Sequence, residues 1–258
     1  MREIVLGLVQ GLTEFLPISS SGHLVIVPVM FGWEEPALGL TVMLHMGTLV
    51  ALLVYFRVEL VRLALGMLGK GEDPAAARRV IRFLLIGTIP AVVAGVALGG
   101  FFEETFHRPY ETCVELVITG LLLIGMERYG ERARRRPLDD GRATFIGAGQ
   151  ALAILPGISR SGATIGAGLL AGLSREEATR FSFLLSIPAI AGAGLLDLAE
   201  GELIVSAASV AGTVMSGVAG YLSIAYLLRF VRTHSLTVFA WYLFAIGPIA
   251  ALVIWLRG

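Results

Sequence analysis

The sequence predicts an all-α, polytopic membrane protein with a single domain built from two inverted repeats. Three observations predict this fold class. The first is composition: 56% of the 258 residues are hydrophobic, 16% are charged and 32 are glycine, with a mean hydropathy of +0.81, which no ordinary soluble domain matches. The second is a polar motif that occurs twice. The third is a separation of basic loops from acidic loops along the chain.

The repeated motif places polar and charged residues inside strongly apolar surroundings. Residues 10–24 read QGLTEFLPISSSGHL, and residues 150–164 read QALAILPGISRSGAT. Six residues recur 140 positions later, in the pairs Gln10 and Gln150, Leu12 and Leu152, Ile18 and Ile158, Ser19 and Ser159, Ser21 and Ser161, and Gly22 and Gly162. This uniform offset indicates a duplicated unit.

Each copy of the motif interrupts a segment that is apolar enough to enter a bilayer. The run from Ile4 to Met30 is broken by Pro17 and by residues 19–22, and the run from Ala143 to Gly172 is broken at residues 156–157 and again at 159–162. Proline breaks helices, and non-helical backbone at membrane depth is tolerated only where it is buried or lines a cavity. We therefore predict two re-entrant pairs of half-helices.

The other apolar segments predict six transmembrane helices, at Ala37–Phe56, Phe83–Gly100, Thr112–Met126, Phe181–Leu198, Leu203–Leu228 and Leu236–Leu256. A span needs roughly 20 residues, so Thr112–Met126 is short unless its flanking side chains reach the membrane surface. The segments between them are predicted loops, at Phe31–Pro36, Arg57–Arg82, Phe101–Glu111, Glu127–Arg142, Ala199–Glu202 and Arg229–Ser235.

Basic residues gather in alternate loops. Of the 20 Lys and Arg, six lie in residues 57–82, six in 127–142, and two each in 173–180 and 229–235. The other loops carry glutamates, namely Glu34, Glu35, Glu103, Glu104, Glu111, Glu200 and Glu202. Cytoplasmic loops are enriched in Lys and Arg, so the basic loops are predicted to be cytoplasmic. All the basic loops lie on one side of the membrane, and all the acidic loops on the other, only if both interrupted segments return to the side from which they enter.

Each half then consists of one re-entrant hairpin and three crossings. Because three is odd, the second half begins on the opposite side of the membrane from the first. The halves, residues 1–126 and 143–256 with the linker 127–142, are therefore predicted inverted repeats whose broken helices meet near the midplane. Both termini are predicted to be extracytoplasmic.

Glu14 and Arg160 are charged residues at the breaks of the two repeats. A carboxylate at membrane depth is costly and normally faces a cavity, a partner or an ion. A guanidinium presents a fork of donors that suits phosphate, and glycines on both sides of Arg160 let the backbone approach closely. A salt bridge between Glu14 and Arg160, or structural pairing of Glu14 with other polar groups, is the alternative interpretation.

The remaining motif residues suit phosphate binding where the second half-helices begin. Serine commonly caps helices, so some of these serines are expected only to cap. Exposed amides beside serine hydroxyls also form a phosphate site. The predicted substrate-binding residues are Ser19, Ser21, Gly22, Gly157, Ser159, Ser161, Gly162 and Thr164. His23 follows Ser20 by three residues, close enough to hydrogen-bond it or to exchange a proton with a phosphate oxygen.

Charge and cysteine content exclude several other classes. A net charge of zero argues against a nucleic acid partner, which requires a basic face. Cys113 is the single cysteine, so it forms no internal disulfide and indicates no metal site. Glu14 interrupts the apolar N-terminal run and no small-residue cleavage site follows, so no signal peptide is expected.

At these motifs the sequence resembles a known family, the undecaprenyl pyrophosphate phosphatases associated with bacitracin resistance. The resemblance extends over essentially the whole chain, including HMGT at residues 45–48 and FSFLLSIPA at residues 181–189. It implies removal of the terminal phosphate from a C55 polyprenyl diphosphate, which recycles the lipid carrier for cell-wall synthesis. It also implies a multi-pass protein of the bacterial inner (plasma) membrane, with an active site open to the extracytoplasmic face, and a divalent cation, Mg²⁺ or Ca²⁺.

By position, the resemblance assigns a catalytic glutamate to Glu14, the nucleophile to Ser20, the family's histidine to His23 and phosphate binding to Arg160. Some members have a second glutamate where this chain has Gln10, so a metal site of two carboxylates is in doubt here. Glu14 is then the candidate metal ligand, and Gln10 offers at most a neutral amide oxygen. His45 belongs to a family motif but is equally well interpreted as a hydrogen bonder in helix packing.

Alternatives remain open at this stage. In one mechanism Ser20 attacks phosphorus while Glu14 or His23 transfers protons; in the other, water attacks and Ser20 only binds phosphate. A lipid-carrier flippase, alone or together with phosphatase activity, is the rival function, because inverted repeats with broken helices are also the architecture of transporters. The expected partners are the polyprenyl diphosphate and membrane lipid, and a homodimer is kept open.

Overall fold

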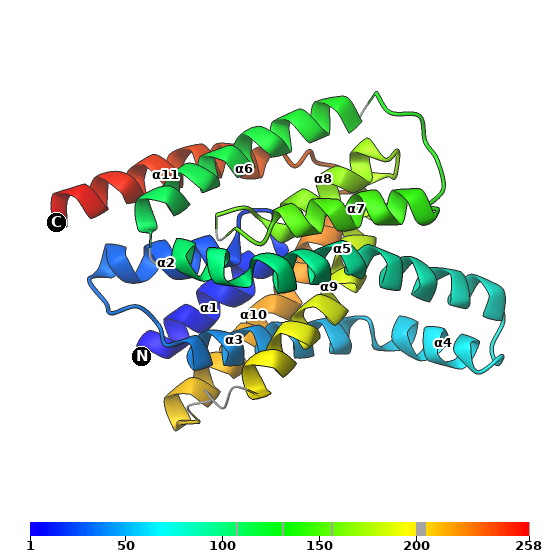
Figure 1. Cartoon of the computed structure of the whole chain (residues 1–258), viewed down its shortest axis with the longest axis horizontal. Helices are drawn as coiled ribbons and strands as arrows, with labels where there is room; N and C mark the ends of the chain where they lie inside the picture. The colour runs from blue at the N-terminus through cyan, green and yellow to red at the C-terminus, as the bar shows by residue number, and fades with distance from the viewer. Residues whose placement is uncertain (107, 131, 156, 200–204, 258) are drawn as a thin grey trace.

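The computed structural model describes residues 1–106, 108–130, 132–155, 157–199 and 205–257. Within these ranges every regular element is an α-helix, and there are eleven (Figure 1). They are α1 (Arg2–Phe15), α2 (Ser20–Phe31), α3 (Leu38–Tyr55), α4 (Arg57–Met67), α5 (Pro74–Phe106), α6 (Pro109–Gly130), α7 (Asp140–Leu152), α8 (Arg160–Leu170), α9 (Arg175–Ala199), α10 (Ala207–Phe230) and α11 (Thr237–Arg257).

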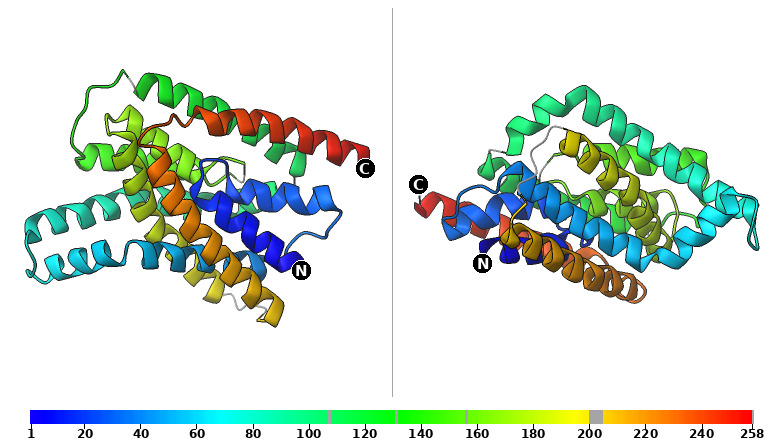
Figure 2. Two further views of the ribbon diagram at one scale, coloured as in Figure 1. Left: turned by 180° about the vertical axis from the view of Figure 1, so that it is seen from behind. Right: turned by 90° about the horizontal axis from the view of Figure 1, so that it is seen from below.

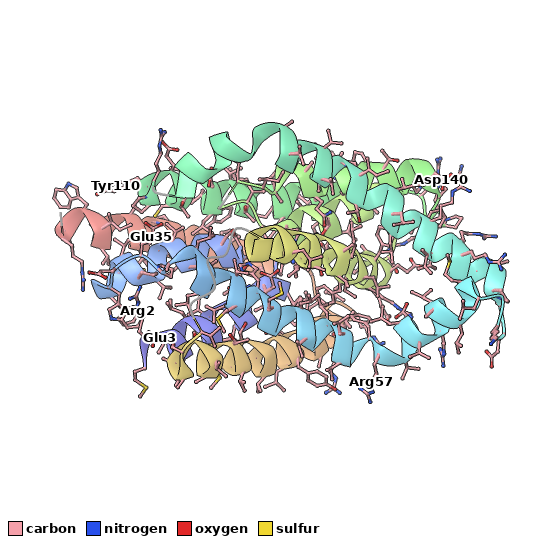
Figure 3. The ribbon with its side chains drawn as sticks, turned by 60° about the horizontal axis from the view of Figure 1, so that its bottom comes forward. Arg2, Glu3, Glu35, Arg57, Tyr110 and Asp140 are labelled. Atoms are coloured by element: carbon pink, nitrogen blue, oxygen red, sulfur yellow. The ribbon has the colours of Figure 1, made fainter. Side chains whose placement is uncertain are left out.

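Six of the described helices are long and apolar enough to cross a membrane, namely α3, α5, α6, α9, α10 and α11. They correspond one for one to the six predicted spans. The prediction of an all-helical, multi-pass membrane protein is confirmed at this level. Glu35 and Tyr110 lie toward the end of the molecule that carries both termini, whereas Arg57 and Asp140 lie toward the opposite end (Figures 1 and 3).

The predicted loop from Arg57 to Arg82 is wrong, because most of it is helical. It contains α4 and the start of α5, joined by residues 68–73. Asp73 accepts a hydrogen bond from the amide of Ala76 at 2.9 Å, and Pro74 is tolerated in the first turn of α5. Leu, Ala and Arg are strong helix formers, so the fall in hydropathy marks the end of an apolar stretch and not the end of a helix.

The predicted boundaries of α6 are also too narrow. This helix has 22 residues, from Pro109 to Gly130, because charged residues such as Glu127 and Arg128 continue the helix beyond its apolar part. The predicted connector Phe101–Glu111 is partly helical, since α5 runs to Phe106. Residue 107, Pro156 and residues 200–202 of the predicted loop after Ala199 lie outside the described ranges.

Two helix pairs, α1 with α2 and α7 with α8, are interrupted as the sequence predicted. The first break is shorter than expected, because Ser20, Ser21 and Gly22 already belong to α2. The outer ends of α1 and α2 both lie at the end of the molecule that carries the two termini (Figure 1). The outer ends of α7 and α8 both lie at the opposite end.

A close glycine contact of α1 has a counterpart in α7 at the same spacing along the chain as the two motifs. α1 packs along α10, and α7 packs along α5 (Figure 2). A Cβ on Gly7 would lie 2.1 Å from the carbonyl oxygen of Gly212, and a Cβ on Gly147 would lie 2.3 Å from that of Gly87. Small residues allow such close approach of membrane helices. Gly7 and Gly147 are separated by the same 140 positions as the two motifs.

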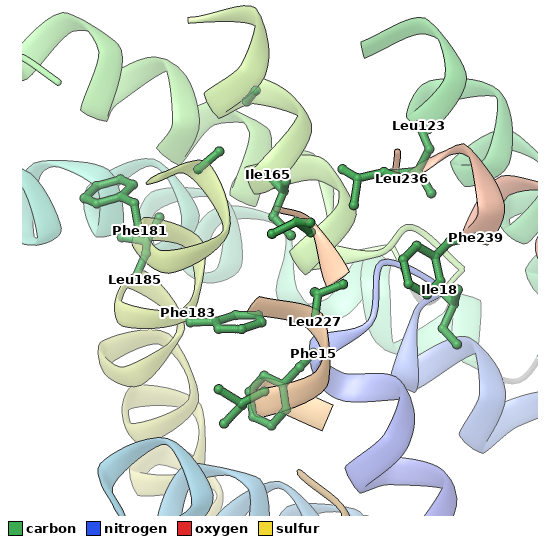
Figure 4. Packing of buried hydrophobic residues seen from close by; sticks show 14 of the residues in the cluster. Phe15, Ile18, Leu123, Ile165, Phe181, Phe183, Leu185, Leu227, Leu236 and Phe239 are labelled. Carbon is green, nitrogen blue, oxygen red and sulfur yellow. The ribbon is translucent and has the colours of Figure 1, made fainter. Parts of the chain in front are cut away.

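The core brings the first break next to α9. Phe15, at the end of α1, is fully buried and packs edge-on against Phe183 of α9, with ring centroids 5.3 Å apart (Figure 4). Ile18 in the break is also buried and belongs to the same apolar cluster. These contacts fix the end of α1, and therefore the position of Glu14, one residue before Phe15.

Candidate active site

A cavity of about 320 Å³ lies between α3, α9 and the two breaks. Its polar lining comes from Glu14, Ser19, Ser20, Ser21, Thr41, His45, Ser159 and Arg160. Its apolar lining comes mainly from α3 and α9, with Leu38, Val42, Met46, Ala189, Ile190 and Ala193. Polar groups from both copies of the motif therefore meet in one cavity whose sides are apolar.

Glu14 is the centre of the polar network. Its side chain is 4% exposed, and Arg160 binds Oε1 through Nη2. The hydroxyl of Ser20 donates to Oε2 at 2.5 Å, and Nε2 of Gln10 donates to the same oxygen at 2.9 Å. A buried charge needs such partners. The salt bridge that the sequence left as an alternative is therefore present, in the same cavity as the predicted phosphate-binding groups.

The contact between Ser20 and Glu14 has the geometry of a nucleophile and its base. A hydroxyl is a weak nucleophile until a neighbouring base accepts its proton, and the two groups must lie within hydrogen-bond reach. Ser20 is the first residue of α2, and its hydroxyl contacts Glu14 near the end of α1. The carboxylate is thus placed to accept the Ser20 proton directly.

His45 is the residue of this network that the sequence interpretation undervalued. Its Nδ1 donates to the carbonyl oxygen of Thr41 at 2.8 Å, and its Nε2 lies 3.7 Å from Oε2 of Glu14. When the ring is protonated, it places a second cation beside the carboxylate. The available signal was an ionisable residue inside the apolar span of α3, which by default indicates function.

His23 does not bond to Ser20, contrary to the sequence prediction. Its Nδ1 donates to the carbonyl oxygen of Ser19 at 2.7 Å. In the neutral ring Nε2 then accepts from the hydroxyl of Tyr242, 2.8 Å away. His23 is buried, and its ring stacks on Tyr242 with ring centroids 5.7 Å apart. Stacking on α11 draws the imidazole away from Ser20, and His23 is not among the residues that line the cavity.

Ser19 has an unusual backbone conformation directly before Ser20. Its φ is +68°, and among the described residues other than glycine no further positive φ occurs. Such a conformation costs of order 1–3 kcal/mol and persists only where surrounding contacts hold it. The bond from His23 to the Ser19 carbonyl and the bond from the Gly22 amide to Ser19 Oγ at 3.3 Å are two such contacts.

Only some of the predicted substrate-binding serines and glycines line the cavity. Ser19 and Ser159 line the cavity but also cap α2 and α8, accepting from the amides of Gly22 and Gly162. In the structure these two glycine amides already have a serine partner, and a role of Gly22 and Gly162 in substrate binding stays a prediction. The other predicted residues outside the cavity lining are Gly157, Ser161 and Thr164; Thr164 donates to the carbonyl oxygen of Arg160 at 2.7 Å.

The two breaks also bond to each other. Ser161, in the first turn of α8, donates through Oγ to the carbonyl oxygen of Leu16 in the first break at 2.9 Å. This bond joins residues 145 positions apart, and the pair of Arg160 and Glu14 joins residues 146 positions apart. The site is therefore complete only when the two interrupted helix pairs are folded against each other.

No group of three or more His, Cys, Asp or Glu side chains that would hold a metal ion occurs in the described part of the chain. Glu14 is the one carboxylate among the described residues that line the cavity. The amide oxygen Oε1 of Gln10 is buried and has no hydrogen-bond partner in the structure. The cavity region therefore offers a cation one carboxylate, that of Glu14, and beside it the unpartnered amide oxygen of Gln10.

Comparison with known proteins identifies the family. A family model described as "Bacitracin resistance protein BacA" matches residues 3–249. The chain belongs to this family. A protein named undecaprenyl-diphosphatase from Moorella thermoacetica is 42% identical over 261 residues, covering 100% of this chain and 98% of the relative. A protein of the same name from Geobacter sulfurreducens is 45% identical over 265 residues, covering 97% of each.

The match covers both copies of the motif. The matched range includes Glu14 and Ser20 in the first copy and Arg160 in the second. The resemblance predicted from the two motifs is thereby confirmed, and it rests on nearly the whole length of the chain and not on the motifs alone.

Proposed function

We propose that this chain is an undecaprenyl-diphosphatase, which hydrolyses a C55 polyprenyl diphosphate to the monophosphate and inorganic phosphate. The family supports the reaction. The observation that carries it to particular residues is the Ser20 hydroxyl bonded to Glu14, beside Arg160, in one cavity. The relatives are named for a phosphatase, so the alternative of a lipid-carrier flippase gains no support. Hydrolysis returns the carrier lipid for further cell-wall synthesis.

In the proposed mechanism Glu14 accepts the Ser20 proton as Oγ attacks the terminal phosphorus. The anhydride P–O bond breaks, the lipid monophosphate leaves, and a phosphoserine remains. Glu14 passes this proton to the departing lipid phosphate. In the second step Glu14 accepts a proton from water as the water attacks the phosphoserine, and returns it to Oγ of Ser20 as inorganic phosphate leaves. A guanidinium has five N–H donors, so Arg160 can bind phosphate while Nη2 contacts Glu14. In the other mechanism, water attacks the phosphorus directly and Ser20 only binds phosphate.

The shape of the cavity suits a lipid diphosphate. The polar residues bind the diphosphate, and the apolar residues of α3 and α9 contact the first part of the prenyl chain. A cavity of about 320 Å³ is far too small for a C55 chain, so most of the prenyl chain lies outside it, among membrane lipid.

The residues present fit a cation that is shared with the substrate. Mg²⁺ is usually held by one or two carboxylates together with substrate phosphates. Glu14, with Oε1 of Gln10, would hold Mg²⁺ or Ca²⁺ in this way. The bound cation would supply positive charge that offsets the charge of the diphosphate.

Purified protein is expected to release inorganic phosphate from a polyprenyl diphosphate in detergent. A chelator should lower the rate, and added Mg²⁺ or Ca²⁺ should restore it. The double variant Glu14→Gln with Ser20→Ala, purified in parallel, reports contaminating phosphatase. No release above this blank would refute the phosphatase; release that a chelator leaves unchanged would refute only the cation.

The finer architecture that we propose is a pair of inverted repeats with re-entrant hairpins in a bacterial inner membrane. Three observations support it: the two interrupted helix pairs open to opposite ends, the Gly7 and Gly147 contacts correspond, and both termini lie at one end. In this arrangement the basic segments are cytoplasmic, and the active site opens to the extracytoplasmic face.

Impermeant thiol labelling tests this orientation. In a background of Cys113→Ser, which removes the one buried native thiol, Glu34→Cys should be labelled in intact cells. Lys70→Cys and Arg134→Cys, at exposed positions of the basic segments, should be labelled only after permeabilisation. Labelling of Arg134→Cys from outside intact cells would disprove the proposed topology.

A further inference from the structure

Two side chains of α6 hold the backbone of the second break. Oε2 of Glu115 accepts a hydrogen bond from the amide of Gly157 at 2.8 Å. One turn later, Thr119 donates to the carbonyl oxygen of Gly157 at 2.9 Å and accepts from the amide of Ser159 at 3.3 Å. The proposed mechanism uses neither residue, although Glu115 is a half-buried carboxylate inside a helix long enough to cross the membrane.

The contact is close enough to require glycine. A Cβ on Gly157 would lie 2.2 Å from Cβ of Glu115 and 2.8 Å from the carbonyl oxygen of Thr112. Glycine therefore lets the break lie directly on α6, where both the N–H and the C=O of one residue find partners. A buried backbone group without a partner costs about 1–3 kcal/mol, so these bonds fix the path of the break.

The fixed segment ends at Arg160. Ser159, the residue before Arg160, is 99% buried and caps α8 through its bond from the Gly162 amide at 3.0 Å. α6 thus holds the break from one side, while Ser161 bonds to Leu16 on the other. The Cα of Arg160 lies between these two attachments, and only its long side chain is left to adjust.

We propose that Glu115 and Thr119 are positioning residues that set the place of Arg160 against the diphosphate. This inference rests on the proposed function of Arg160. Glu115 acts here as a hydrogen-bond acceptor and not through its charge, because its partner is a neutral backbone amide. The first repeat has a corresponding arrangement, in which Tyr242 of α11 holds His23, and His23 holds the carbonyl of Ser19 before Ser20.

The test uses three variants that separate hydrogen bonding from charge. Glu115→Gln keeps an acceptor oxygen, Glu115→Leu removes it, and Thr119→Val removes the hydroxyl at nearly constant volume. Misplacement of a catalytic group by about 1 Å can cost about 10²-fold, so Glu115→Leu and Thr119→Val should lower kcat/KM by roughly 10- to 100-fold. Glu115→Gln should retain activity close to wild type. The control is Glu111→Gln, an exposed residue of α6 paired with Arg108.

A double-variant cycle shows whether the effect acts through Arg160. Because variants that disable one unit are not additive, Glu115→Leu should lower the residual rate of Arg160→Lys by less than about threefold. A full additional loss in that background, or equal losses in Glu115→Gln and Glu115→Leu, would overturn the proposal.

If Glu115→Leu does not fold, Thr119→Val and Glu115→Gln decide the matter. If Arg160→Lys itself is fully active, the function proposed for Arg160 fails, and this inference fails with it. If Glu115→Leu and Thr119→Val are fully active while Arg160→Lys is not, this inference alone fails.

Discussion

Arg160→Lys is expected to lose most phosphatase activity even though the positive charge is kept. Arg160 pairs with buried Glu14 and lines the cavity, so one planar fork has to serve both the carboxylate and the phosphate. An ammonium is a compact point donor on a different stem and cannot reproduce that bidentate contact. Loss of a donor that stabilises developing charge typically costs about 10² to 10³ in kcat, and we expect a loss of this size.

Lysine is the informative replacement because it keeps the buried carboxylate compensated. Alanine would leave Glu14 without its cation, which costs about 3–5 kcal/mol, and unfolding would obscure the result. The matched control is Arg175→Lys, at the pair with buried Glu127, which does not line the cavity. Hydrolysis is measured as phosphate release. Activity of Arg160→Lys close to wild type would mean that the residue acts through charge alone or only pairs with Glu14.

The sequence predicted the features that depend on composition and duplication. Six spans follow from apolar runs. The first break follows from Pro17 and residues 19–22, and the second from residues 156–157 and 159–162. The meeting of Glu14 with Arg160 is predicted from the duplicated motif, because inverted repeats bring their broken helices together. Residues 146 positions apart were assigned to one site for this reason.

The helix boundaries that the sequence missed share one physical cause. Hydropathy detects burial in lipid, and a helix does not have to stop where its apolar residues stop. α4 carries Arg57 and Arg62, and the last turns of α6 carry Glu127 and Arg128, yet all of these residues are compatible with helices. Charge in these segments was therefore mistaken for the absence of structure.

The errors at the site concern hydrogen-bond partners that are remote in sequence. Spacing along the chain predicts a bond between His23 and Ser20, whereas the ring bonds to the carbonyl of Ser19 and to Tyr242, which is 219 positions away. The hydrogen bonds from Glu115 and Thr119 to the second break could not be predicted for the same reason, because their partners lie 38 to 42 positions away. Sequence spacing indicates which residue types gather at a break but not which helix lies against it.

Glu14→Gln is expected to lose roughly 10² to 10⁴ in rate, the usual cost of losing a general acid or base. The amide keeps the size of the side chain and can still accept from Ser20, but it cannot take the Ser20 proton. It also removes the carboxylate that would hold a cation, so the remaining rate should depend less on Mg²⁺ or Ca²⁺. Substrate binding should survive better than hydrolysis. Hydrolysis retained in Glu14→Gln would remove the proposed mechanism.

Ser20→Ala, measured beside Glu14→Gln, decides between the two modes of attack. If Ser20 is the nucleophile, its loss removes the only path to the phosphoserine, and the rate should fall as far as in Glu14→Gln. If water attacks, Ser20 contributes one hydrogen bond to Glu14 or phosphate, and the loss should be mild, since such a bond is worth about 0.5–1.5 kcal/mol. In both cases Glu14 is the base. The difference is whether the Ser20 hydroxyl, 2.5 Å from Oε2 of Glu14, attacks phosphorus or only forms a hydrogen bond. Trapping of labelled phosphate on the wild type and not on Ser20→Ala would establish the covalent route, whereas a mild loss without trapping would assign attack to water held by Glu14.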